Sequence, residues 1–135
     1  MEDTIISELK MTRFFAKNIT FTLNETFIST NQEVTLTPNF KRQINKIDNN
    51  TAEVRLFFDI DKNEDLPFEI HVELVGSFEL KNWESEELLP VMSTNTVAIM
   101  FPYLRTIVSS LTTNANIPPY IIPIINIARL LEKTE

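Results

Sequence analysis

Apolar and polar residues alternate along much of the first half of the chain, which is the pattern of strands with one buried face. The alternation covers residues 13–28, 33–47, 52–61 and 67–80. Turn-forming residues separate the last three segments, at 48–50 and 62–65. Four long strands in series, joined by short turns or one crossover loop, predict an antiparallel sheet.

Two positions interrupt the alternation. Pro38 has no amide proton to give to a ladder, so the second strand is expected to lie at an edge or to carry a bulge there. At Val75 and Gly76 the alternation breaks, and a glycine inside a strand marks a bulge or a close backbone approach.

The second half of the chain has the three- and four-residue spacing of an amphipathic helix. Ser93 or Thr94 can cap a helix that runs to about Thr113. Its apolar stripe consists of Val97, Met100, Leu104, Ile107 or Val108, and Leu111. A second apolar side consists of Ile99, Phe101 and Tyr103. A helix with two apolar sides is expected to have two packing partners, here the sheet and another subunit. Pro102 lies inside the pattern and is expected to kink or split the helix.

The segments that flank this helix differ in character. Residues 82–90 are acidic and are expected to hold one short turn, whereas residues 126–132 have the stripe of a short terminal helix. Residues 114–123 form a proline-rich, mostly apolar connection. Because prolines suppress helix and ladder alike, this connection is either draped over the core or forms one wall of a groove for extended apolar peptide.

Composition bounds the fold and excludes several kinds of chemistry. The 135 residues fit one domain, expected to span 1–135 with a flexible start at 1–10. There is no cysteine, one histidine and one glycine, which argues against thiolate metal sites, most other metal chemistry and glycine-rich phosphate loops. The net charge of −7 argues against nucleic acid as a partner, and the basic cluster at Lys41, Arg42 and Lys46 is interpreted as a solvated strand face or turn.

The chain also lacks the signals of export and membrane insertion. Residues 1–10 mix acidic and apolar residues, unlike a signal peptide, and no stretch approaches the ~18 uncharged apolar residues of a membrane span. Asn-x-Thr sequences at Asn18, Asn24 and Asn49 are then chance occurrences. We expect a cytoplasmic protein without membrane insertion.

His71 and a run of acidic residues are the candidates for catalysis or metal binding. His71 falls on the polar side of its strand, and nothing in the sequence nominates a nucleophile or an orienting group for it. The residues Asp59, Asp61, Glu64 and Asp65 lack the glycine and the distant glutamate of a calcium loop. No catalytic residue, metal site or cofactor is predicted, so the protein is expected not to be an enzyme.

One motif in the helix is distinctive, Phe101-Pro102-Tyr103-Leu104-Arg105, and Ile117-Pro118-Pro119 follows it in the connection. Together with the strand segments 13–21, 53–56 and 68–78, the motif resembles the SecB family of protein-export chaperones, whose helix carries Phe-Pro-Tyr-Ala-Arg. The resemblance covers roughly residues 13–131.

The resemblance implies an α+β fold, a four-stranded antiparallel sheet with helices packed on one face, assembled as a dimer of dimers. It also implies an ATP-independent holdase that binds unfolded polypeptides or preproteins for Sec-dependent export. Family members bind the motor ATPase SecA partly through acidic residues on the outer sheet. Those positions fall on Asn18, Thr22 and His71 here, so the docking face for SecA is expected to be absent.

Site residues follow from the pattern and the resemblance together. The predicted peptide-binding groove consists of Phe27, Val34, Leu36, Tyr120, Ile121 and Ile124, with Phe27 replacing the aromatic residue common in the family's crossover loop. The predicted interface of the homotetramer consists of Tyr103, Leu104, Ile107 and Leu111. Leu111→Glu is expected to split the tetramer, because it buries an unpaired charge.

Two other hypotheses stay open. The chain can be a dedicated SecB-like chaperone or interaction protein for a single partner such as an antitoxin, without coupling to the export motor, and the missing acidic positions favour this alternative. An enzyme of unknown type is the third hypothesis, and no constellation of residues supports it.

Overall fold

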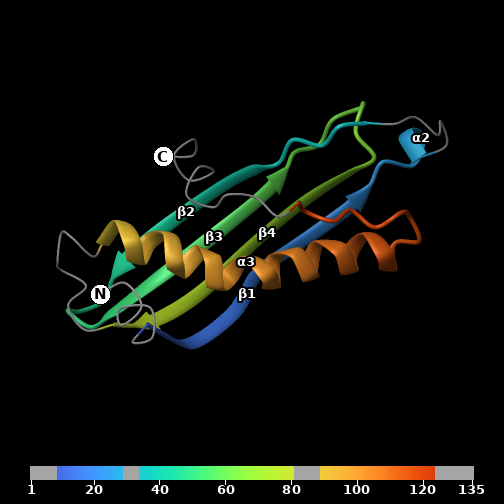
Figure 1. The fold of residues 1–135 in the computed structure, drawn as a ribbon. Helices are drawn as coiled ribbons and strands as arrows, with labels where there is room; N and C mark the ends of the chain where they lie inside the picture. The colour runs from blue at the N-terminus through green and yellow to red at the C-terminus, as the bar shows by residue number, and fades with distance from the viewer. Residues whose placement is uncertain (1–8, 29–33, 81–88, 124–135) are drawn as a thin grey trace.

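The fold is known from a computed structural model, which describes residues 9–28, 34–80 and 89–123. A helix lies across one face of a four-stranded sheet (Figure 1). The elements are β1 (Lys10–Leu23), α2 (Glu25–Ile28), β2 (Asn39–Lys46), β3 (Thr51–Ile60), β4 (Phe68–Glu79) and α3 (Leu89–Asn114). The predicted short turn at 86–88 and terminal helix at 126–132 lie outside the described residues.

The sheet has the order β1-β4-β3-β2, and every neighbouring pair is antiparallel, as predicted. The strands β2, β3 and β4 follow one another as hairpins, whose first turn is closed by the Ile47 amide bonding the Thr51 carbonyl at 2.9 Å. The first strand lies on the far side of β4, so the chain must cross from one edge of the sheet to the other between β1 and β2.

The two central strands form the core because their alternate side chains all point to the face that α3 covers. The buried residues of β3 are Ala52, Val54, Leu56, Phe58 and Ile60, and β4 adds Phe68, Ile70, Val72, Leu74 and Phe78 on the same face. From α3 come Val97, Met100, Phe101, Leu104 and Val108. Full burial of each large apolar side chain is worth about 1.5–3 kcal/mol, so this face holds the sheet and helix together.

Three predicted boundaries were wrong, each for a local reason. The first strand ends at Leu23 rather than at 28, because the Asn24 side chain accepts a bond from the Phe27 amide (3.3 Å) and caps α2. The second strand begins only after Pro38, at Asn39. The main helix begins at Leu89 rather than near Ser93, since a proline at position 90 is tolerated in a first helical turn.

Pro102 does not split the helix, which runs without a break from Leu89 to Asn114. The ring of Pro102 is exposed, on the side of α3 away from the sheet. The hydroxyl of Thr106 donates to the Pro102 carbonyl at 3.1 Å. Pro102 has no amide proton to donate to the carbonyl four residues earlier. Because Pro102 lies on the solvent side of the helix, water can bond that carbonyl instead.

Gly76 is a site of close packing, one of the two alternatives that the sequence left open. The bulge alternative was wrong: the register shifts lie in β1, between Met11 and Arg13 and between Ala16 and Asn18. At Gly76 a Cβ atom would lie 2.9 Å from Cε1 of Phe78 and 3.1 Å from the Met100 sulfur. The glycine thus lets α3 approach the middle of the sheet.

Replacing Gly76 by alanine is expected to lower the free energy of unfolding by about 1–2 kcal/mol, because Met100 and Phe78 must move to admit a methyl group. Urea unfolding followed by circular dichroism measures the change. The control is Ser77→Ala, on the opposite, half-buried face of the same strand, which should stay within about 0.5 kcal/mol of the parent. Equal losses in both variants would contradict the close approach at residue 76.

Candidate functional site

An apolar groove of about 520 Å³ lies at one end of the sheet, beside the proline-rich segment that follows α3. No charged side chain lines it. The lining residues are Phe27, Val34, Leu36, Pro67, Phe68, Asn116, Ile117, Pro118, Pro119 and Tyr120. We call this cavity the apolar groove, and its composition suits hydrocarbon side chains rather than a charged or phosphorylated ligand.

The apolar groove is assembled from four separate stretches of the chain. Phe27 comes from α2, Val34 and Leu36 precede β2, Phe68 begins β4, and residues 116–120 follow α3. Its floor is aromatic, because the ring of Phe68 lies 5.4 Å from that of Phe21 and 6.3 Å from that of Tyr120. A site that needs four distant segments exists only in the folded chain.

The structure brings together Phe27, Val34, Leu36 and Tyr120, four of the six residues predicted for a groove. Ile121 is 60% exposed and is not part of the lining, while position 124 lies outside the described residues. Sequence reasoning missed Pro67, Phe68, Asn116, Ile117, Pro118 and Pro119. The Ile117-Pro118-Pro119 run was available as a signal, since it opens the very segment predicted to form a wall.

The wall of the groove starts from a defined helix end. Asn116 adopts a left-handed conformation (φ 62°), its amide bonds the Thr113 carbonyl at 3.0 Å, and the Ile117 amide bonds the Thr112 carbonyl at 3.4 Å. These are the two bonds of a Schellman motif, in which asparagine replaces the usual glycine. The motif reverses the chain, so that the next residues run back along α3 (Figure 1).

Tyr120 is the main polar group of the groove besides Asn116. Burial raises the pKa of its phenol above the ordinary value of 10.0, so the hydroxyl is neutral at physiological pH. Its backbone amide donates a hydrogen bond to the Thr112 hydroxyl at 2.8 Å. The groove therefore offers one neutral hydroxyl and one side-chain amide in an otherwise apolar lining.

The four residues predicted for an oligomer interface are placed in different ways. Leu104 is fully buried under α3 against the sheet, so its place in the interface prediction was wrong: it belongs to the core of the chain itself. Tyr103 is 47% exposed and packs against Phe14, with 4.6 Å between ring centroids. Ile107 and Leu111 are half-buried and also contact the core.

His71 lies on the face of the sheet that α3 does not cover, between two carboxylates. Its Nδ1 is 2.7 Å from the Asp59 carboxylate across the strand pair, and its Nε2 is 3.2 Å from that of Glu69. The hydrogen bond to Asp59 is the main cause of a raised pKa for His71, and the bond to Glu69 adds to it against the effect of burial. Among the described residues no group of histidine, cysteine and acidic side chains is arranged to hold a metal ion.

Stability is expected to fall as pH rises above 6.5, because the folded state binds the His71 proton more tightly than the unfolded chain does. The contribution is fully present below pH 6.5 and is lost as pH passes through the higher folded-state pKa. Urea midpoints at about pH 6 and about pH 8 measure it. His71→Gln should abolish the difference, since the chain has one histidine; an unchanged difference in this variant would assign it to other groups.

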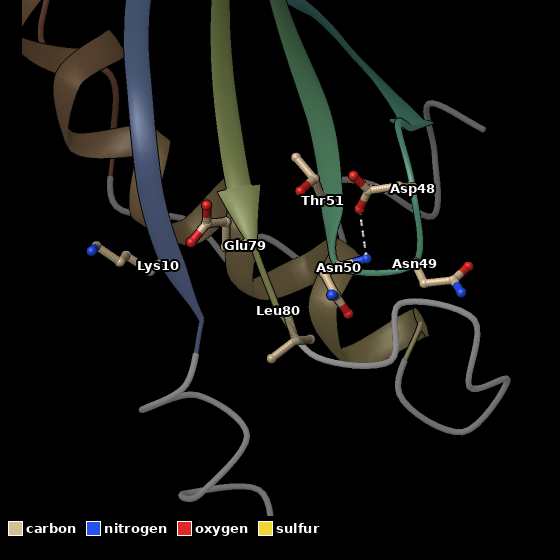
Figure 2. A pocket seen from close by; sticks show the side chains of 7 residues that line it. All are labelled: Lys10, Asp48, Asn49, Asn50, Thr51, Glu79 and Leu80. Atoms are coloured by element: carbon tan, nitrogen blue, oxygen red, sulfur yellow. Dashed lines mark hydrogen bonds between the residues drawn. The ribbon is translucent and has the colours of Figure 1, made fainter.

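A larger hollow, of about 910 Å³, lies at the opposite end of the sheet (Figure 2). Its lining residues are Lys10, Asp48, Asn49, Asn50, Thr51, Glu79 and Leu80. The Asp48 carboxylate points to the Asn50 amide, which donates to it at 2.8 Å within the hairpin turn. Only Leu80 in this lining is apolar, and the Asp48 carboxylate is already bonded within the turn. This hollow therefore offers few contacts for the apolar side chains of a bound polypeptide.

Comparison with known proteins relates both the sequence and the fold to a family. The sequence matches the SecB family, described as "Preprotein translocase subunit SecB", over residues 3–135. An uncharacterized protein of Methanocaldococcus jannaschii is 33% identical over 132 residues, which are 94% of this chain and 84% of that protein. The protein-export protein SecB of Bartonella quintana is 30% identical over 97 residues, 70% of this chain. That match spans only 61% of the Bartonella protein.

Two solved structures share the fold. A SecB-like chaperone of Mycobacterium tuberculosis, in complex with a peptide from an antitoxin, superimposes with a TM-score of 0.66 at 16% identity, covering 93% of this chain and 95% of the other. A Streptococcus agalactiae protein of unknown function gives 0.65 at 14% identity, covering 87% and 98%. No helix among the described residues is long and apolar enough to cross a membrane. The match to the family model over residues 3–135 shows that the chain belongs to the SecB family.

Proposed function

We propose that this protein is an ATP-independent holdase, which binds non-native polypeptides in the apolar groove and is not an enzyme. The observation that carries the proposal is a groove without charged side chains, lined by Phe27, Val34, Leu36, Phe68, Ile117 and Tyr120 in a chain of the SecB family. The exposed apolar side chains of an unfolded client can pack against such a lining and shield it from water. Folded proteins keep those side chains buried, which accounts for selectivity toward non-native chains.

A single groove binds weakly by the physical chemistry of such contacts. Burial of one large apolar side chain contributes about 1.5–3 kcal/mol, whereas ordering each bound residue costs about 1–2 kcal/mol. Several grooves on one assembly raise apparent affinity, because the second binding event becomes intramolecular. A holdase built from this chain therefore gains from being an oligomer.

The assembly that we propose is a dimer of dimers, formed through the exposed flank of α3 beside β1. Tyr103 at 47% and Ile19 of β1 at 44% are large apolar side chains exposed on the single chain. Ile107 and Leu111 lie partly buried nearby in the same helix. Exposed apolar side chains on a helix and a neighbouring strand are typical of a surface that a second subunit covers.

Serving a single partner such as an antitoxin is a second candidate function, favoured by the outer face of the sheet. Asn18, Thr22 and His71 fall where SecA-binding family members carry acidic residues. Four acidic residues of that face are engaged: Arg55 bonds Glu53 at 3.0 Å and Glu73 at 2.6 Å, and His71 bonds Asp59 and Glu69. Carboxylates held by neighbouring cations are less available to a basic partner, which speaks against docking on SecA. The Mycobacterium chaperone of similar fold binds an antitoxin peptide.

The holdase proposal is tested with a chemically denatured client diluted into buffer with the purified protein. Light scattering by aggregates should fall as the protein is added, with no need for ATP, and should be abolished near one client per assembly. Recovery of many unfolded precursors by pulldown from the cytoplasm of the host, where we propose that the protein acts, would favour a general holdase over a dedicated one. Undiminished aggregation at a stoichiometric amount of protein would contradict the general holdase.

A further inference from the structure

From residue 118 onward, the wall of the apolar groove cannot hold its position by regular backbone bonds of its own. Residues 118, 119 and 123 are prolines and have no amide proton, so half of the positions from 118 to 123 cannot donate. None of the described strands pairs with this segment, and the sheet ends at β1 on one side and β2 on the other. Beyond the two backbone bonds of Asn116 and Ile117 at the helix end, whatever fixes the wall must therefore come from side chains.

Two side chains of α3 bond the backbone of the wall. The hydroxyl of Thr112 accepts a hydrogen bond from the Tyr120 amide at 2.8 Å. The guanidinium Nε of Arg105 donates to the Ile122 carbonyl at 2.7 Å. Because the two helical residues are seven apart, they lie on one face of α3, two turns from each other. The segment runs back along that face (Figure 1).

Both bonds lie in places where losing them is costly. Thr112 is fully buried, and its own proton is directed to the carbonyls of Val108 (3.2 Å) and Ser109 (3.0 Å), which leaves a lone pair for Tyr120. Ile122, 1% exposed, anchors the far end of the segment in the core. A buried amide without an acceptor destabilises its position more than the bond itself contributes.

We infer that Arg105 and Thr112 are positioning residues of the groove, which fix the height and register of its proline-rich wall without touching the client. This inference rests on the proposed function. With both bonds in place, Ile117 and Tyr120 line the groove together with Phe68, whose ring lies 6.3 Å from that of Tyr120. Without the Thr112 acceptor, the Tyr120 amide turns toward water. The proline-rich wall then shifts relative to Phe68 on the other side of the groove.

We call the two bonds, from the Tyr120 amide to Thr112 and from Arg105 to the Ile122 carbonyl, the latch. It is tested with Thr112→Val, which keeps the shape of the side chain and removes the acceptor. The matched variant Thr112→Ser keeps the hydroxyl. Hydrogen exchange of the Tyr120 amide, read by NMR on the intact protein, reports the bond itself. Affinity for a short fluorescein-labelled peptide rich in Leu and Phe, read by anisotropy, reports the groove. In Thr112→Val both should change on the order of tenfold, exchange faster and binding weaker, while Thr112→Ser should restore both to near the parent values.

Arg105→Met and Arg105→Lys repeat the comparison at the second bond and keep the inference testable if Thr112→Val does not fold. The methionine variant should bind the peptide on the order of tenfold more weakly. The lysine variant should recover part of this loss of affinity by donating to the Ile122 carbonyl. Unchanged exchange in Thr112→Val would overturn the latch. Faster exchange with unchanged affinity would overturn its role in the groove. If the parent protein fails to bind the peptide, the proposed function fails, and the exchange rates still decide whether the latch exists.

Discussion

Replacing Val34 by glutamate is expected to weaken the binding of an unfolded client by more than tenfold. Val34 lines the apolar groove and is 40% exposed on the free protein, so the charge costs the folded state little. When a client fills the groove, the carboxylate loses water and gains no partner, because no cation lines the cavity. Anisotropy of a labelled unfolded protein, titrated with the variant, measures the loss.

The neighbouring residue provides a matched control for this variant. Thr35 is exposed and does not line the groove, so Thr35→Glu adds the same charge one residue away. It should bind the client within about twofold of the parent protein, since a surface substitution of this kind acts only through screened electrostatics. Equal losses in both variants would mean that overall negative charge weakens binding, and the groove would then not be the binding site.

Tyr103→Glu is expected to dissociate the assembly into smaller species. Tyr103 is exposed on α3 of the single chain, and in the proposed dimer of dimers a second subunit would cover it. A glutamate there would be buried without a partner, which costs several kcal/mol at an interface. Multi-angle light scattering at constant protein concentration should report a lower mass. Leu111→Glu is less informative, because Leu111 is half-buried against the core of its own chain.

Tyr103→Phe separates assembly from the fold of the single chain. Phenylalanine keeps the ring that packs 4.6 Å from Phe14 and removes only the hydroxyl, so the mass should equal that of the parent. Circular dichroism should show that Tyr103→Glu retains the helix and the sheet. A Tyr103→Glu variant of parental mass would place the subunit interface elsewhere.

The periodicity of individual segments was predictable because a strand or helix with one buried face records that face in its own residues. The alternation along β3 and β4 marked the residues that are in fact buried, and the stripe through Val97, Met100 and Val108 marked the covered side of α3. The boundaries were less predictable. A cap made by Asn24 and a proline in the first turn of α3 are local effects that the alternation does not contain.

The candidate groove was predictable in part, for a related reason. An almost wholly apolar segment with three prolines has no regular partner, so its residues had to lie against the core or line a cavity. Phe68 was missed because its position in the alternation is that of an ordinary core residue. Leu104 was assigned to the interface because two apolar sides of one helix do not reveal which side meets the sheet.

The four strands, the long helix and the resemblance to the SecB family could be inferred from the chain alone, because the periodicity of each element and each motif lies in residues that are close together. The folded chain was needed to see that α2, the approach to β2, the start of β4 and the segment after α3 meet in one groove. The same holds for the bonds from Arg105 and Thr112 to that segment and for the pairing of His71 with Asp59. These contacts join residues from different elements, so sheet order, register and chain reversal set them, and none of these is written in the periodicity of a single segment.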